Sequence, residues 1–408
     1  MKRFQFPNPR RSVWVLAITG AASVGNLFLA GLSENVVVLS GGLLGLAYAG
    51  WRFRGIRLTQ RSDEKPCAAE TIIPAELPKA LDTEAPLDDP NALVDRMFAQ
   101  GRYALLLRRQ LLESLSAEQA ARAVEALQKN MAMVPSGEVV LTHPFDAADL
   151  GSDHAEEVRA TVGKLMRVEP LYLDRYPVTN QQYFRFVEAG GYQQMSLWDP
   201  EILPGVLDFV DQTQQPGPRH WIDGCFRRGE NNHPVVGISW YEATAFARWV
   251  GKRLPTDAEW VKSASWPVRL SDGDPIQRRY PWGEAIDRDK ANLWGSGPES
   301  IVPVEQFADG MSVGGVYQLV GNVWEWTAGG YQHPSLRDLS ANVPWKSLRG
   351  GAFDTYFDNQ ATCDFQSGDH PMARCHNVGF RCALGAVDVA TCGAAPSTET
   401  SPAGEQVA

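Results

Sequence analysis

Positive charge and cysteine are both scarce in this sequence. Its 408 residues carry 38 Lys and Arg against 48 Asp and Glu, which gives a formal net charge of −10. A protein that binds nucleic acid usually presents a basic surface, so this balance predicts no nucleic-acid partner. The six cysteines are Cys67, Cys225, Cys363, Cys375, Cys382 and Cys392. Their spacing contains no CxxC pair and no zinc-ligand pattern, so the sequence predicts no zinc site.

Long apolar runs are confined to the N-terminal region. Residues 13–32 and 36–51 carry no charged side chain, and the first run has a length that spans a bilayer. Basic clusters flank the two runs, whereas the turn between them carries only Glu34. We therefore expect a transmembrane hairpin over residues 1–61 in the inner (cytoplasmic) membrane, with the rest of the chain on the cytoplasmic side. A signal peptide is the alternative, but the second apolar run argues against it.

Three further segments flank the main domain. Residues 62–89 hold four prolines among scattered acids and predict a disordered linker. Residues 90–131 predict a helical hairpin, because Ser116 and Gln119 have the spacing of a capping box ahead of an apolar face. We expect these helices to pack against the main domain; a docking surface for another protein is the alternative. The tail over residues 385–408 ends in Ser, Thr, Pro and Gly, and predicts disorder.

Four motifs follow one another in the remaining chain. They are GKRLPTDAEW at 251–260, LVGNVWEWT at 319–327, LRGGAF at 348–353 and NVGFRCA at 377–383. In this order they resemble the formylglycine-generating enzyme, or sulfatase-modifying factor, family. The resemblance implies one α+β domain over residues 132–384, a variant of the C-type-lectin fold with much irregular chain. Within it, the Pro- and Gly-containing residues 196–232 predict a long surface loop, where fold variants usually place specificity.

The second motif places a carboxylate between two tryptophans. Glu325 follows the Gly321-Asn322 pair, whose residue types permit a sharp turn. A carboxylate buried between two indoles needs a partner, because an unpaired buried charge is very costly. That partner can be a cation, a hydrogen-bond network or a bound metal ion. The alternative is an ordinary aromatic core strand with Glu325 at the surface.

The family resemblance implies calcium as that partner. Family members bind calcium through Asn and Glu side chains and backbone carbonyls, and hard oxygen ligands suit this ion. The positions that match a first site are Gln318, Gly321, Val323 and Glu325, with glutamine in place of the usual asparagine. A second site would use Asn292 and Leu293, but the acidic segment that completes it is shortened to residues 295–299. We therefore expect structural calcium, chiefly at Glu325.

The copper chemistry of the family is not expected in this chain. The family's enzymes oxidise a substrate cysteine to formylglycine with copper and oxygen. They use two closely spaced cysteines after the Arg-Gly-Gly motif, preceded by a serine. At the matching positions this sequence has Ala352, Thr355 and Gln360, none of which replaces a thiolate. Cys363 and Cys375 remain as candidate catalytic thiols.

Iron is not expected either. Oxygenases of the ergothioneine-synthase type share this fold and hold iron on an added helical domain, with a His-x-x-x-His-x-Glu pattern. None of the seven histidines forms that pattern, and residues 90–131 contain no histidine. Lone histidines are more often hydrogen-bonded structural groups than metal ligands, so the sequence predicts no iron site.

Two classes of function remain open. The first is a membrane-anchored binding module for a protein or peptide ligand. Related domains serve as ligand-binding heads with variable residues after the Arg-Gly-Gly motif. Here residues 353–372 are rich in polar and aromatic side chains that suit recognition. The second class is a formylglycine-generating or diverged metal-dependent oxidase that acts on protein cysteine. Loss of the cysteine pair favours the first class, with a binding surface at Asp354, Tyr356, Asp358 and Asn359.

Overall fold

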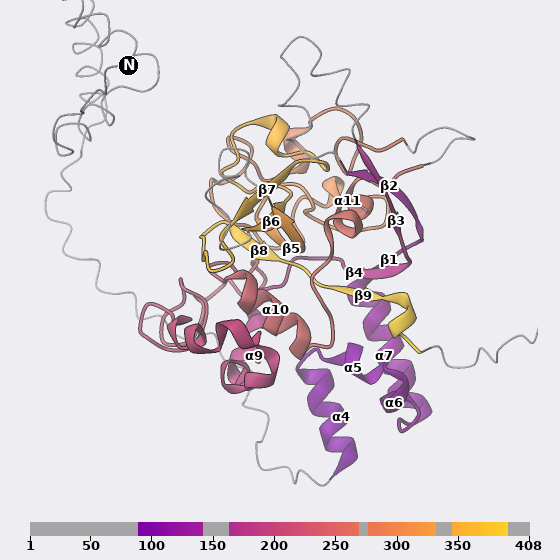
Figure 1. The fold of residues 1–408 in the computed structure, drawn as a ribbon, viewed down its shortest axis with the longest axis vertical. Helices are drawn as coiled ribbons and strands as arrows, with labels where there is room; N and C mark the ends of the chain where they lie inside the picture. Colours follow the sequence, from indigo (N-terminus) through magenta and orange to yellow (C-terminus); the bar gives the residue numbers. More distant parts are fainter. Residues whose placement is uncertain (1–88, 142–162, 269–275, 332–344, 391–408) are drawn as a thin grey trace, which may run out of the picture. The chain divides into compact units, whose positions relative to one another are not determined.

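A computed structural model of the chain describes residues 89–141, 163–268, 276–331 and 345–390 (Figure 1). Helices and short strands are mixed along these ranges and are joined by long irregular segments. The predicted α+β class is therefore confirmed.

The membrane localisation predicted from the sequence is corrected by the structure. Within the described ranges, no helix has both the length and the apolar character that crossing a membrane requires. The apolar runs at 13–32 and 36–51, and with them the predicted hairpin over residues 1–61, lie outside the described residues. So does the predicted linker, apart from its last residue.

Four helices form the N-terminal part of the described chain. In α4 (Pro90–Ala99), the side chain of Asp89 accepts a hydrogen bond from the Asn91 amide at 2.9 Å. α5 (Tyr103–Leu106) and α6 (Arg109–Leu112) are single turns, and α7 (Ala117–Asn130) begins with the capping box of Ser116 and Gln119. The predicted pair of helices is thus joined by two short ones. Their shared apolar cluster includes Met97, Leu106, Leu107, Leu127, Met131 and Leu384.

Two small sheets lie at the start of the main domain. The three-stranded sheet contains β1 (Met131–Val134), β4 (Leu171–Asp174) and β9 (Ala383–Gly385), with β4 in the middle and both pairs antiparallel. The strand that ends the domain therefore lies beside one near its beginning. The other sheet is the antiparallel pair of β2 (Gly137–Leu141) and β3 (Lys164–Val168).

A four-stranded sheet brings three of the sequence motifs together. Its order is β7 (Gln366–Asp369), β6 (Trp345–Arg349), β5 (Trp324–Tyr331) and β8 (Val378–Phe380). β5 pairs antiparallel with β6 and parallel with β8, which places Glu325 level with Arg349 on one side and Gly379 on the other. Segments far apart in the sequence thus become neighbours of the same carboxylate-bearing strand.

Three helices of the main domain begin with capping boxes, in which the N-cap and the third helical residue exchange hydrogen bonds. They are α9 (Asn180–Glu188) with Thr179 and Gln182, α10 (Trp240–Trp249) with Ser239 and Glu242, and α11 (Asp257–Ser265) with Thr256 and Glu259. Figure 1 shows α11 between the four-stranded sheet and the β2–β3 pair, and α11 contacts both.

The described residues also contain short 3-10 helices. They are η1 (Gly191–Gln193), η2 (Met195–Leu197), η3 (Pro200–Asp208), η4 (Arg288–Lys290), η5 (Ala308–Gly310), η7 (Asp358–Gln360) and η8 (Ala386–Asp388).

Residues 196–232, predicted as a surface loop, contribute to the aromatic core instead. Trp198 and Trp221 are each 4% exposed and pack in one cluster with residues of α9 and α10. In the same cluster, Tyr183 of α9 stacks on Phe246 of α10 with ring centroids 5.3 Å apart. Prolines and glycines keep this segment irregular, but an irregular backbone does not prevent burial of its large side chains.

The end of the described chain also differs from the predicted disordered tail. η8 follows β9, and the Ala390 amide donates a hydrogen bond of 3.0 Å to the Leu107 carbonyl of the N-terminal helices. Residues 385–390 are therefore held by backbone contacts. The remainder of the predicted tail lies outside the described residues.

A buried ion pair of the main domain also forms a hydrogen bond to the N-terminal helices. The Lys252 Nζ lies 2.7 Å from Asp174 Oδ1 and donates a hydrogen bond of 2.9 Å to the Tyr103 hydroxyl. The side chains of Lys252 and Asp174 are only 7% and 12% exposed. Burial alone would lower the pKa of Lys252, but the nearby Asp174 and Tyr103 hold this pKa above its ordinary value. The lysine therefore stays charged across the neutral pH range.

Replacement of Asp174 by alanine should destabilise the protein strongly. It leaves Lys252 buried without its carboxylate, and breaking a buried pair from one side costs about 3–5 kcal/mol. Urea unfolding followed by tryptophan fluorescence measures this loss. The control is Asp95→Ala, which removes an exposed partner of Arg122 and should cost about 0–1 kcal/mol. Equal losses in the two variants would contradict the prediction.

Candidate functional site

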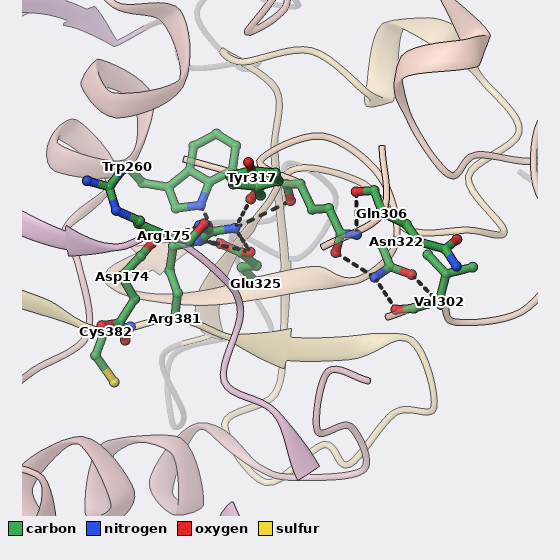
Figure 2. A network of polar contacts seen from close by, with 11 residues as sticks. Asp174, Arg175, Trp260, Val302, Gln306, Tyr317, Asn322, Glu325, Arg381 and Cys382 are labelled. Carbon is green, nitrogen blue, oxygen red and sulfur yellow. Dashed lines mark hydrogen bonds and ion pairs between the residues drawn. The ribbon is translucent and has the colours of Figure 1, made fainter. Parts of the chain in front are cut away.

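The carboxylate of Glu325 lies at the centre of a buried polar network (Figure 2). Glu325 is 1% exposed and its partner Arg381 is fully buried. The guanidinium contacts both oxygens, with Nη2 2.7 Å from Oε1 and Nε 2.8 Å from Oε2. The indole of Trp260 donates a hydrogen bond to Oε2 at 2.7 Å. Of the partners left open by the sequence, the structure therefore supplies a cation and one indole donor.

Arg381 uses its remaining donors on the backbone of two other segments. Nη1 donates to the Asp174 carbonyl at 3.0 Å, and Nη2 donates to the Tyr317 carbonyl at 2.7 Å. Asp174 ends β4, whereas Tyr317 precedes the second motif. A planar guanidinium with five donors can make all these contacts at once. This one side chain thus connects β5, β4 and the chain that leads into the Gly-Asn turn.

The turn before β5 is held by two side-chain amides. Asn322 has a φ of 69°, in the left-handed region that asparagine tolerates. Its side chain donates to Gln318 Oε1 at 2.7 Å and accepts from the Val302 amide at 2.9 Å. Gln318 in turn donates to the carbonyls of Pro303 and Gln306 at 3.0 and 3.1 Å. The two amides therefore lock residues 302–306 against the turn (Figure 2).

The first predicted calcium site brings its residues together, but its side-chain oxygens already have partners. Both oxygens of Glu325 face Arg381, and Oε1 of Gln318 faces Asn322. The guanidinium provides the positive charge that calcium would bring, and it would repel a second cation. As these side chains lie, they do not fit a calcium ion. The prediction of calcium at Gln318, Gly321, Val323 and Glu325 therefore rests on the family resemblance alone.

The second predicted site offers one buried oxygen without a partner. Among the described residues, nothing donates a hydrogen bond to Asn292 Oδ1, and Asn292 is 1% exposed. Gly297 is so close that a methyl group on it would fall 1.9 Å from this oxygen. The carbonyl of Leu293 already accepts from the Ser296 amide at 3.0 Å. Within the described ranges no group of three or more His, Cys, Asp or Glu could hold a metal ion. Calcium at Asn292 and Leu293 stays a prediction of the family resemblance.

The two candidate catalytic thiols are not assembled into a copper site. Cys363 and Cys375 are free cysteines that pack in different apolar clusters. Burial, with a smaller effect of Asp364, raises the pKa of Cys363 well above its usual value. Burial and Asp369 raise the pKa of Cys375 to about 11. Neither thiol is therefore poised as a thiolate nucleophile near neutral pH.

Three exposed aromatic side chains meet on the surface, and we call them the aromatic face. Trp294, Tyr356 and Phe357 are 45%, 64% and 59% exposed. Ring centroids are 6.4 Å apart for Trp294 and Tyr356 and 5.2 Å apart for Tyr356 and Phe357, both edge to face. In the described parts of the chain, every other aromatic residue is buried or half-buried. Exposed aromatic surface is therefore concentrated at this one place.

The segment after the Arg-Gly-Gly motif supports the aromatic face. Thr355, which stands where the family has a cysteine, is buried and accepts a hydrogen bond from the Ala352 amide at 2.8 Å. Its carbonyl accepts from the Trp294 amide at 3.3 Å. Arg288 donates to the Trp294 carbonyl at 2.6 Å and forms an ion pair with Asp358. These contacts attach Trp294 to the loop that carries the other two rings.

The four residues predicted from the sequence as a binding surface lie on or beside the aromatic face. Tyr356, Asp358 and Asn359 are exposed. Asp354 is half-buried and accepts two hydrogen bonds of 3.0 Å from the Asn377 side chain. Their part in binding remains a prediction, and Asp354 has a structural role as well.

Sequence reasoning did not single out Trp294 or Phe357. Phe357 belongs to the stretch 353–372, whose composition indicates recognition, so composition was a usable signal for it. Trp294 belongs to a separate stretch and follows Leu293, which is 2% exposed. Nothing in its local sequence shows that this ring points outward. Only the hydrogen bond to Thr355 reveals that it joins the later loop.

Residues 116–386 match the family described as "Sulfatase-modifying factor enzyme 1-like domain". The match covers well over half of the chain, so the chain belongs to this family. It agrees with the motifs at 251–260, 319–327, 348–353 and 377–383, whose residues form β5, β6 and β8 and the network around Glu325.

Individual relatives of this chain have different activities in their names. "Serine/threonine-protein kinase Pkn1" of Chlamydia trachomatis serovar L2 is 34% identical over 221 residues, which are 52% of this chain and 33% of that protein. The chain thus spans a third of that relative. "Formylglycine-generating enzyme" of Thermomonospora curvata is 28% identical over 64% of this chain and 95% of its own. "Inactive C-alpha-formylglycine-generating enzyme 2" of Bos taurus is 30% identical over 63% of this chain and 88% of its own.

Loss of Arg381 should destabilise the domain even when calcium is supplied. Arg381→Met leaves the Glu325 carboxylate buried and unpaired, at a cost of about 3–5 kcal/mol. The double variant Arg381→Met/Glu325→Leu removes both charges and should regain part of that loss. Urea unfolding with 5 mM EDTA and with excess calcium, on the order of millimolar, gives the comparison. A wild-type protein that EDTA weakens to the level of Arg381→Met would instead support calcium at this site.

Proposed function

We propose that this chain is a ligand-binding member of the family, and that the aromatic face holds a segment of a protein or peptide. The observation that carries the proposal is the grouping of Trp294, Tyr356 and Phe357 on the surface, each well exposed. Tryptophan and tyrosine supply large contact area at a small cost in side-chain entropy, and they dominate the energetics of many interfaces. A cluster of three is therefore suited to anchor a ligand.

Polar groups around the aromatic face suit the rim of a binding surface. Asp358 and Asn359 are exposed next to Phe357. His376 lies beside Asp354, with Nε2 3.5 Å from Oδ2. A polar rim around aromatic anchors is the usual anatomy of a protein–protein interface. Backbone groups of an extended peptide could hydrogen-bond to these side chains while its own side chains contact the rings.

The absence of the family's cysteine pair supports binding over oxidation. Thr355 is buried and braces the loop, so this position serves the shape of the aromatic face. Gln360 carries an amide that cannot act as a thiolate. One relative is itself described as an inactive formylglycine-generating enzyme, so the family includes members that have lost the oxidation. The oxidase alternative requires a thiolate pair from Cys363 and Cys375, which pack in different clusters.

The chain should not convert a sulfatase-type peptide to formylglycine. The full chain, loaded with Cu(I) in air, is incubated with a peptide that carries Cys-x-Pro-x-Arg, and the peptide mass is followed. The peptide should remain unchanged, because two thiolates are needed to hold copper and exchange with the substrate. The Thermomonospora curvata enzyme is the positive control. Turnover that disappears in Cys363→Ser or Cys375→Ser would restore the oxidase.

Removal of two of the rings should weaken peptide recognition. A random 12-residue peptide library on phage is selected against the wild-type chain, and recovered peptides are then measured by calorimetry. Tyr356→Ala/Phe357→Ala should weaken them by at least about tenfold, because aromatic anchors contribute about 2 kcal/mol or more each. The control is Leu207→Ala, which trims a side chain that is 80% exposed elsewhere. Peptides that bind both variants like the wild type would refute the aromatic face as the binding site.

A further inference from the structure

Lys262 is a largely buried lysine for which the described residues provide no carboxylate partner. It lies on α11, is 5% exposed, and makes no hydrogen bond or ion pair with the described residues. The other cations whose side chains are buried to a similar extent each face a carboxylate. They are Lys252 with Asp174, Arg349 with Asp257, Arg374 with Glu242 and Arg381 with Glu325. Burial lowers the pKa of Lys262, as expected for an ammonium that nothing compensates.

The ammonium of Lys262 lies in the wall of a pocket of about 460 Å³. One side of the pocket is the turn and strand at 135–138, and the other side is Trp266 and Pro267 after α11. A methyl group on Gly137 would fall 3.3 Å from Nζ, so the lysine head rests against this glycine. Figure 1 shows α11 beside β2 and β3, the two strands that contribute the other wall. Lys262 is the buried member of an otherwise exposed or half-buried lining.

The other charged groups of the pocket do not neutralise Lys262. Arg167 lines the pocket from β3, but its Nε is 3.2 Å from Glu169 and its side chain is 73% exposed. Glu138 also lines the pocket and has an interaction of its own. Neither carboxylate contributes to the pKa of Lys262, for which burial is the cause. Among the described residues of the pocket, Lys262 is thus the ammonium without a carboxylate partner, and as a compact point charge it can receive a single anionic group.

The apolar part of the wall can receive the organic body of an anion. Trp266 adopts a φ of 43°, unusual for a bulky residue, and its ring packs on Gly314, where a methyl group would fall 2.4 Å from the indole. Pro135 and Pro267 complete the apolar part of the wall. The volume lies within the range of small-molecule sites and exceeds what a bare carboxylate or phosphate fills.

We propose that this pocket binds a small organic carboxylate or phosphate monoester, with the anionic group on Lys262 and the apolar body against Trp266. The pocket shares no residue with the aromatic face. The proposal therefore goes beyond the function proposed above and is tested separately from it. Because the two anionic groups share this chemistry, the test includes one ligand of each kind.

Calorimetry of the full chain with benzoate and with phenyl phosphate, at low salt and neutral pH, tests the site. At least one anion should bind, whereas neutral benzyl alcohol should not. Lys262→Met keeps the length of the side chain without its charge and should weaken binding at least tenfold. The matched control is Lys129→Met, an exposed lysine that likewise lies in the last turn of a helix, and it should bind like the wild type.

Thermal unfolding provides the second readout. The anion that binds should raise the melting temperature of the wild type and of Lys129→Met, because a ligand that binds only the folded state stabilises it. It should leave Lys262→Met unchanged. Without ligand, Lys262→Met should melt at or above the wild-type temperature, because it removes a largely buried lysine charge that no carboxylate of the described residues compensates. No binding of either anion to the wild type, or equal binding to Lys262→Met, would overturn the proposal.

Discussion

The buried ion pair of Glu325 and Arg381 is the interaction on which the domain depends most. Both side chains are buried, so removal of either one leaves the other as an unpaired charge in the interior. The pair connects β5 to the motif at 377–383, which lies 56 residues further along the sequence. Through its other donors Arg381 also holds the backbone at Asp174 and Tyr317. Four separate segments must therefore be in place together before any of them is satisfied.

This arrangement leaves the following loop free to carry recognition. β6 ends at Arg349, which is itself buried and paired with Asp257, and the Gly350-Gly351 turn comes next. Both glycines adopt positive φ, and a methyl group on Gly350 would fall 2.6 Å from the Leu319 carbonyl. The turn is thus closely packed against the frame, while residues after it reach the surface. Tyr356 and Phe357 of the aromatic face are among the residues after this turn, and both are exposed.

Local signals in the sequence were reliable where the interaction itself is local. The capping box predicted for Ser116 and Gln119 joins residues three apart, and it is present. The calcium prediction was of another kind. It placed an ion beside Glu325 because the family resemblance implies one there, and the sequence does not show which distant groups lie beside this carboxylate. In the structure, the guanidinium of Arg381, 56 residues further along the chain, provides the positive charge beside Glu325.

The sequence by itself determined the family and the α+β class, because motif identity and residue chemistry need no knowledge of distance. Tertiary structure alone decided the partner of Glu325, the burial of residues 196–232 and the meeting of Trp294 with Tyr356. It also decided that Lys262 is buried without a carboxylate. These features depend on which segments are neighbours in space. That proximity results from the packing of the whole domain and is not encoded in any single stretch of residues.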